Sequence, residues 1–212
     1  MSRTAAPLWI KICGLRSAAD VAAAAAAGAD AVGFVFHAGS PRHLPLQAAQ
    51  ALAAAVPRGV EKVAVFLHPT QAELDAAIAA VRPDWVQTDA TDLESLELQA
   101  GQRVLPVYRT DRALPAQAAL PQRYLLESGR SGTGERADWD AAARLARYGE
   151  VVLAGGLDAA NVGAAIAAVQ PFGIDVSSGV ELTRGVKDAA LITNFVNAAR
   201  AMHARLASSS LE

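Results

Sequence analysis

The sequence predicts a single-domain α/β protein, a (β/α)8 or TIM barrel, and three observations support this prediction. Short apolar stretches alternate with alanine-rich helical stretches along the whole chain, a pattern typical of parallel βαβ units. About eight such units follow one another without a linker-like change in composition. The length of 212 residues suits one barrel with short loops, since such barrels commonly need roughly 250 residues. Seven clear units would also suit a doubly wound open sheet, so periodicity alone favours the barrel without deciding it.

The first half of the chain has clear helix boundaries. Ser17 and Asp20 form the pattern of a capping box before an alanine run, and Thr70 is a second capping residue. Helices are expected to stop at Gly28 and Pro57. The expected strands are 8–12, 31–36, 60–66 and 85–87, and the expected helices are about 17–28, 46–56, 70–81 and 93–98.

The second half continues the alternation with weaker helices. Pro106 lies inside the fifth expected strand, where a proline cannot donate to the ladder. The expected strands are 103–107, 123–127, 151–154 and 174–176, and the expected helices are 112–120, 138–148, 161–169 and 187–206. We therefore expect residues 1–207 to form one barrel domain. Residues 208–212 have no apolar period and end in Leu-Glu, so we expect a disordered or tag-derived tail.

Composition and charge argue against several functional classes. The chain is 52% hydrophobic but only 5% aromatic, as in sheets that helices cover on both faces. A net charge of −2 gives no electrostatic reason to bind nucleic acid or an anionic membrane. One cysteine excludes an intrachain disulfide, and the four histidines lack metal-ligand spacing, so no metal is expected. Without a leader or a long apolar run, we expect a soluble cytoplasmic protein.

Two glycine-bearing turns follow the last two expected strands. They are Gly155-Gly156 and Ser177-Ser178-Gly179. In barrels, the loops after strands seven and eight frequently bind phosphate through backbone N–H groups. Glycine can also simply permit a tight turn, and this reading would suffice for one such loop. Two turns in the two expected places favour a small phosphorylated substrate.

Two ionisable side chains end expected strands at the same rim. Cys13 ends the first strand, and although a lone cysteine on an apolar strand is most often a small buried hydrophobe, a thiolate here could be a nucleophile or a base. Glu127 ends the sixth strand and is either a surface residue or the acid that complements the thiol. The two readings of each residue stay open at this point.

Two further charged residues have a structural and a functional reading. Arg42, in the loop after the second strand, is either a solvated charge or a binding group for a substrate carboxylate. Asp175, on the eighth strand, is either a substrate-binding residue or a buried structural aspartate with a partner. Lys62 and Asp89 have no assigned role.

Motifs spread over almost the whole chain resemble those of the phosphoribosylanthranilate isomerases, and their combination is highly specific. The matching segments are residues 11–15 (KICGL), 28–36 (GADAVGFVF), 40–42 (SPR), 131–134 (SGTG), 138–139 (DW), 154–157 (AGGL), 161–162 (NV), 175–181 (DVSSGVE) and 187–188 (KD).

The resemblance implies a fold, a reaction and roles for the candidate residues. The fold is a (β/α)8 barrel, and the reaction is the Amadori rearrangement of N-(5-phosphoribosyl)anthranilate to 1-(2-carboxyphenylamino)-1-deoxyribulose 5-phosphate in tryptophan biosynthesis, without a cofactor. Glu127 would be the acid that opens the furanose ring, and Cys13 the base that removes the C2′ proton. Arg42 would hold the anthranilate carboxylate, and the two glycine turns the phosphate. A monomer or a homodimer is expected.

Two departures from the family pattern leave alternatives open. Family members usually carry aspartate where this chain has Glu127, and a shift of about 1 Å can cost a hundredfold in rate, so we expect a compensating backbone shift. The usual Gln-Leu-His-Gly is here Gln87-Thr88-Asp89-Ala90. The alternatives are another phosphosugar barrel enzyme, or a phosphosugar-binding barrel that has lost turnover.

Overall fold

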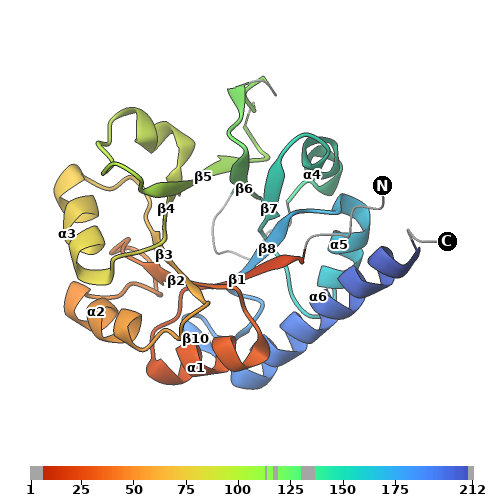
Figure 1. Cartoon of the computed structure of the whole chain (residues 1–212), viewed down its shortest axis with the longest axis horizontal. Helices are drawn as coiled ribbons and strands as arrows, with labels where there is room; N and C mark the ends of the chain where they lie inside the picture. Colours follow the sequence, from red (N-terminus) through yellow and green to blue (C-terminus); the bar gives the residue numbers. More distant parts are fainter. Residues whose placement is uncertain (1–6, 113, 117–118, 130–136, 210–212) are drawn as a thin grey trace.

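A closed barrel of eight parallel strands forms the centre of the molecule (Figure 1). The computed structural model describes residues 7–112, 114–116, 119–129 and 137–209. Each strand pairs with the next in sequence, and β8 pairs with β1 through Lys11↔Asp175 to close the ring. The strands are β1 (Trp9–Cys13), β2 (Ala31–Val35), β3 (Glu61–Val65), β4 (Trp85–Asp89), β5 (Arg103–Arg109), β6 (Arg123–Glu127), β7 (Glu150–Leu153) and β8 (Gly173–Val176). The predicted barrel is confirmed, and the open sheet is excluded.

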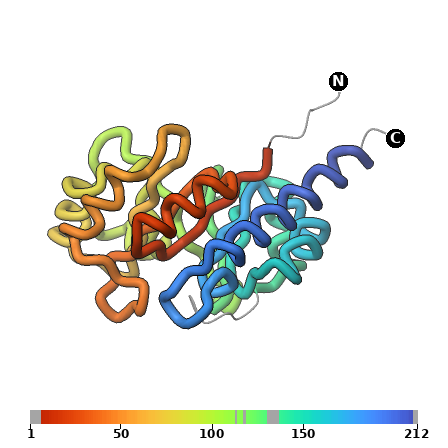
Figure 2. Tube along the Cα trace, turned by 90° about the horizontal axis from the view of Figure 1, so that it is seen from below, coloured from red at the N-terminus to blue at the C-terminus, as the bar shows by residue number. Residues whose placement is uncertain are grey.

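The helices surround the barrel, as the ring-like outline in Figure 1 shows. They are α1 (Ala18–Ala27), α2 (Leu46–Ala54), α3 (Gln71–Val81), the 3₁₀ helix η1 (Ala90–Glu94), α4 (Trp139–Ala146), α5 (Val162–Val169) and α6 (Ala189–Ser209). The predicted capping box of Ser17 and Asp20 is present, and Gly28 ends α1 with φ 89°. Thr70 caps α3 in the same way. Figure 2 shows α1 and α6 side by side, in agreement with their contacts.

Two predicted helices in the middle and the second half of the chain differ from the observed elements. No α-helix forms among the described residues of 112–120; 113, 117 and 118 lie outside them. Pro115 and Pro121 disfavour helical backbone at the residues that precede them. The short helix predicted at 93–98 is η1, which begins earlier at Ala90.

The last helix begins at Ala189 rather than at residue 187, because a β-hairpin precedes it. This hairpin consists of β9 (Glu181–Thr183) and β10 (Val186–Lys187), and Gly185 takes a left-handed conformation at φ 84° in its turn. The helix then continues to Ser209, two residues into the stretch expected to be a tail, while 210–212 lie outside the described residues.

One end of the barrel interior is filled by aromatic and aliphatic side chains. Trp9 and Trp85 lie there, and both indole N–H groups donate to Oε2 of Glu61 at 3.0 Å. Arg103 and Arg123 stack over the Trp85 ring at 4.3 and 4.9 Å. These residues begin their strands or lie near the start, so the opposite end, where the strands finish, is left for a site.

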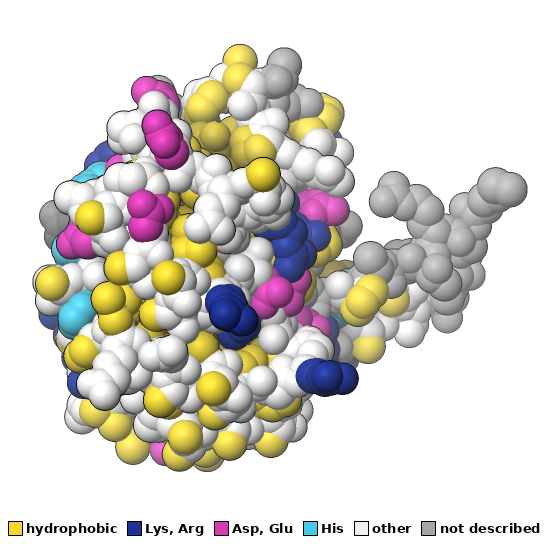
Figure 3. Space-filling view, turned by 60° about the vertical axis from the view of Figure 1, so that its left-hand side comes forward, with side chains coloured by type: hydrophobic (Ala, Val, Ile, Leu, Met, Phe, Trp, Pro, Cys, Tyr) yellow, Lys and Arg dark blue, Asp and Glu magenta, His cyan; other side chains and the backbone are white. Residues whose placement is uncertain are grey.

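The surface carries no large field of one charge sign on the face that Figure 3 draws. Basic and acidic side chains lie close together near its middle, among scattered hydrophobic ones. This agrees with the near-neutral net charge. Among the described residues, no helix has both the length and the apolar character needed to cross a membrane.

Candidate active site

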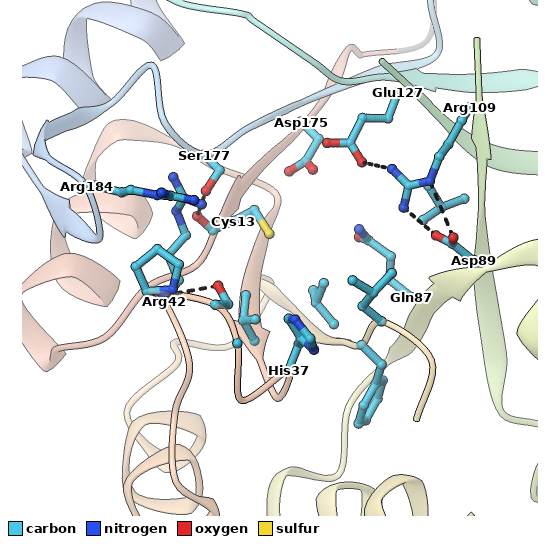
Figure 4. A pocket seen from close by; sticks show the side chains of 18 residues that line it. Cys13, His37, Arg42, Gln87, Asp89, Arg109, Glu127, Asp175, Ser177 and Arg184 are labelled. Atoms are coloured by element: carbon cyan, nitrogen blue, oxygen red, sulfur yellow. Dashed lines mark hydrogen bonds and ion pairs between the residues drawn. The ribbon is translucent and has the colours of Figure 1, made fainter. Parts of the chain in front are cut away.

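A cavity of about 300 Å³ opens at the carboxyl ends of the strands (Figure 4). Five of the candidate residues predicted from the sequence line it, namely Cys13, Arg42, Glu127, Asp175 and Ser177. Four do not line it, namely Gly155, Gly156, Ser178 and Gly179. The cavity therefore brings together residues that are far apart in the sequence, because each ends a strand or follows one.

Cys13 is the last residue of β1, and its side chain points into the cavity (Figure 4). The residue is only 7% exposed. Lys11 lies two residues before Cys13, on the same face of β1, and is fully buried. Its Nζ donates to Oδ1 of Asp175 at 2.9 Å. Burial has the largest effect on the pKa of the Cys13 thiol and raises it. The positive charges of Lys11 and Lys187 act to lower this pKa, and the carboxylate of Asp175 acts to raise it. Asp175 is thus buried with Lys11 as its partner, and its carboxylate also faces the cavity.

Arg42 forms a bidentate ion pair with Glu181 of the hairpin. Nε and Nη2 of Arg42 donate to the two carboxylate oxygens at 2.7 and 2.9 Å, and Nζ of Lys187 donates to Oε1 of the same carboxylate at 2.7 Å. Burial acts to raise the pKa of Glu181, but hydrogen bonds from Arg42, Lys187 and the Gly185 backbone lower it to about 2. Glu181 is therefore an anion that fixes Arg42, whose Nη1 is not part of the pair.

The position of the Arg42 side chain leaves no room for a Cβ atom at residue 14, so this residue is glycine. Its φ is 79°, and a Cβ atom there would lie 2.5 Å from Cδ of Arg42. The loop after β2 therefore packs its arginine directly on the turn that follows Cys13. Glu181 and Lys187 lie in the motifs of residues 175–181 and 187–188, but no local pattern predicts their role, since their contact with Arg42 depends on the fold.

Glu127 ends β6 beside an arginine that sequence reasoning missed. Oε2 of Glu127 lies 3.5 Å from Nη1 of Arg109, the residue that faces it in the register of β5 and β6. Nη2 and Nε of Arg109 donate to Asp89 at 2.6 and 3.4 Å. Asp89 ends β4, so three neighbouring strands each contribute one of these charges. Only Glu127 stood at a predicted strand end, because the predicted strands stopped at 87 and 107, two residues before Asp89 and Arg109.

The two glycine turns lie against each other beyond the cavity. Gly155 and Gly156 have φ values of 91° and 63°, which explains glycine at both positions. A bridge joins Asp158 to Gly179, and a Cβ atom on Gly179 would lie 2.0 Å from the carbonyl oxygen of Leu157. The turns are thus adjacent, and close packing accounts for Gly179.

Within the described ranges, no group of three or more His, Cys, Asp and Glu side chains is arranged to hold a metal ion. The cavity instead places a thiol and a carboxyl group on different strands, with arginines beside both (Figure 4). Such an arrangement can move protons to and from two neighbouring atoms of one ligand, and its cations can bind anionic groups.

Known proteins similar to this chain in sequence and structure include members of one enzyme family. The family model of N-(5'-phosphoribosyl)anthranilate isomerase matches residues 10–198. The isomerase of Azorhizobium caulinodans is 41% identical over 211 residues, covering 92% of both chains. The structure of the Thermus thermophilus isomerase has a TM-score of 0.79 and 30% identity, covering 94% of this chain and all of that one. A phosphoribosyl anthranilate isomerase in complex with reduced 1-(o-carboxyphenylamino)-1-deoxyribulose 5-phosphate has a TM-score of 0.74 and 26% identity, covering 92% and 99%. This chain belongs to the N-(5'-phosphoribosyl)anthranilate isomerase family.

Proposed function

We propose that this protein catalyses the Amadori rearrangement of N-(5-phosphoribosyl)anthranilate in tryptophan biosynthesis, with Glu127 as acid and Cys13 as base. The observation that carries the proposal is the single cavity that both side chains line, Cys13 from β1 and Glu127 from β6 (Figure 4). Family membership supplies the reaction. A carboxyl group and a thiol differ in ordinary pKa, which suits a reaction that first adds a proton and then removes one.

The first step opens the sugar ring. Glu127 donates its proton to the furanose oxygen, the C1′–O bond breaks, and the nitrogen lone pair forms the C=N bond of a Schiff base. Cys13, as thiolate, then removes the C2′ proton; the electron pair of that C–H bond forms the C1′=C2′ bond, and the π electrons of the C=N bond return to the nitrogen, which gives an enolamine. Tautomerisation of the enolamine gives the aminoketose. No electron donor or acceptor is needed, because C1′ is reduced as C2′ is oxidised.

Substrate binding uses cations and backbone N–H groups at opposite ends of the ligand. We assign the anthranilate carboxylate to the part of Arg42 that Glu181 does not occupy, since Arg42 lines the cavity with its side chain fixed. We assign the phosphate to the turns at Gly155-Gly156 and at Ser177, Ser178 and Gly179. Ser177 lines the cavity, and its loop is bridged to the loop after β7. Asp175 would face the reacting carbons beside Cys13.

The second candidate function is a phosphosugar-binding barrel without turnover. The observation that favours it is Glu127, which is one methylene longer than the aspartate usual in the family. A carboxyl group misplaced by about 1 Å could bind near the ring oxygen and still fail to protonate it.

A turnover assay on freshly generated phosphoribosylanthranilate tests both functions. Wild type, Glu127→Gln and Glu127→Asp are compared by the rate at which the aminoketose forms. We expect turnover by wild type and a loss of about 10²–10⁴-fold in Glu127→Gln, the usual contribution of a general acid. Wild type that binds substrate without turnover, together with activity in Glu127→Asp, would instead identify the binding protein.

A further inference from the structure

Arg109 lies between two carboxylates at the acid side of the cavity and binds them unequally. It is buried, as is Asp89, with 7% of each side chain exposed. The contact to Asp89 uses two nitrogens, with a shortest distance of 2.6 Å, whereas the contact to Glu127 is 3.5 Å. Asp89 therefore holds the guanidinium side-on, and Arg109 presents Nη1 to Glu127.

This unequal sharing matters because Glu127 has two conflicting requirements. A guanidinium beside a carboxyl group orients it but also favours its ionised form, and an acid must carry a proton before it can donate one. Burial acts to lower the pKa of Arg109, but Asp89 and then Glu127 and Asp111 outweigh burial and raise it, so the guanidinium stays charged. The counter-charge of Asp89 is what limits its effect on Glu127.

Other described charges around Glu127 come from every side of the cavity. Asp111, after β5, acts on Arg109 and packs beside Gly129, which follows the acid. Arg42 interacts with Glu127 across the cavity. The remaining described titratable groups that line the cavity are Cys13, His37, Asp175 and Arg184. Of these described groups, Arg109 contacts Glu127 directly, and Asp89 is connected to Glu127 through Arg109.

We propose that Arg109 and Asp89 act as a positioning pair for Glu127: Arg109 directs the longer carboxyl group into the cavity, and Asp89 offsets enough of the arginine's charge for that group to carry a proton. The pair acts through Glu127, so this inference rests on the acid role proposed above. It also gives a role to Asp89, which stands where the family usually has histidine.

The inference requires opposite effects from the two single substitutions. Asp89→Asn removes the counter-charge, so Arg109 favours the ionised form of Glu127 more strongly. The titration midpoint of the Glu127 carboxyl should fall by about one pH unit, and kcat/KM at neutral pH should fall about tenfold with it. Arg109→Gln removes the cation beside Glu127, so the titration midpoint of the Glu127 carboxyl should rise. Turnover should fall about 10–100-fold even so, because the carboxyl group loses its orientation.

The midpoint is measured by ¹³C NMR of protein labelled at glutamate side-chain carboxyls, with Glu127→Gln identifying the signal. The matched control is Glu150→Gln. Glu150 pairs with Arg123 at 2.6 Å at the other end of β6, outside the cavity. We expect this control to leave both the midpoint and kcat/KM unchanged. The double variant Asp89→Asn/Arg109→Gln replaces two buried charges by amides and is available if Arg109→Gln alone does not fold. Its midpoint should lie above that of Asp89→Asn.

Midpoints that move in the same direction in Asp89→Asn and Arg109→Gln, or that do not move, would overturn the inference. The NMR titration needs no turnover, so the inference can fail while the isomerase assignment stands. Conversely, inert wild type with opposite midpoint shifts would retain the pairing and reject the proposed reaction.

Discussion

The two sides of the cavity carry opposite charge. On the Cys13 side, cations outnumber carboxylates; the described groups are Lys11, Arg42, Arg184, Lys187, Asp175 and Glu181. On the Glu127 side, carboxylates outnumber cations; the described groups are Arg109, Asp89, Asp111 and Glu127 itself. Surrounding positive charge favours a thiolate, and surrounding negative charge favours a protonated carboxyl group. The difference assigns base and acid to the two sides, as enzymes do with paired ionisable groups.

The two sides also differ in how their charges are connected. Glu181 binds Arg42, Lys187 and the Gly185 backbone, which ties the loop after β2 to the hairpin after β8. On the acid side, the described ion pairs join only β4, β5 and β6. Burial still raises the pKa of Cys13 despite the nearby lysines. On the base side, burial thus disfavours the Cys13 thiolate, and the charges of Lys11 and Lys187 offset part of this effect.

The largest expected effect comes from removing the base. Cys13→Ala should lower kcat by about 10³–10⁴-fold, because a general base contributes up to this amount. Binding of the reduced aminoketose product should remain largely intact, since the arginines and the loop backbone are untouched. Single-turnover kinetics and calorimetry measure the two quantities, with Cys13→Ser as the matched variant. Normal turnover in Cys13→Ala would remove the charge-based assignment of the base.

The buried lysine on the base side should matter for both folding and reactivity. Lys11→Met leaves Asp175 buried without its 2.9 Å partner, which should lower the free energy of unfolding by about 3–5 kcal/mol. Loss of the cation should also raise the pKa of Cys13 further and slow its alkylation by iodoacetamide at pH 8. Lys62→Met is the control, because Nζ of Lys62 donates to the Val81 carbonyl rather than to a carboxylate in the part of the chain that the structure describes. Equal alkylation rates in wild type and Lys11→Met would contradict this role.

Glu181 should make stability depend on pH in the acid range. Its pKa in the folded protein is about 2 against an ordinary value of 4.5, so its stabilisation is present above pH 4.5 and is lost as pH falls towards 2. Glu181→Gln should remove on the order of 3 kcal/mol at pH 7 and flatten the profile between these pH values. Urea unfolding from pH 7 to pH 2 measures this. The exposed Glu94→Gln serves as control, and a Glu181→Gln profile as steep as that of wild type would be the contrary result.

The smallest expected effect concerns Gln87, which lies on the cavity wall between the two sides. Within the described residues, its buried Oε1 has no hydrogen-bond partner. An unsatisfied acceptor costs about 1–3 kcal/mol, so Gln87→Leu should raise the free energy of unfolding by about 1 kcal/mol. If a donor on the substrate fills this place, KM should rise several-fold. Thermal unfolding and steady-state kinetics measure both, and a less stable Gln87→Leu protein would show that the amide is already satisfied.

Sequence reasoning predicted the barrel because its elements depend on local patterns. Apolar runs gave all eight strands within two residues of their observed bounds, and Ser17 and Thr70 gave two capped helix starts. It failed where local signals compete, as at 112–120, where prolines interrupt a helical composition. It also missed the hairpin of β9 and β10, whose strands are too short to show a period.

For the site, the sequence by itself determined which residues lie at or near the carboxyl ends of strands. It therefore placed Cys13, Glu127 and Asp175 at the same end of the barrel. Only the tertiary structure decided their partners. Lys11 meets Asp175 across 164 positions of sequence, and Arg42 meets Glu181 across 139. Arg109 reaches Glu127 because β5 and β6 pair in that register. Local patterns set the period and the ends of each element, whereas register and ring closure set which charges become neighbours, and neighbouring charges decide which group holds a proton.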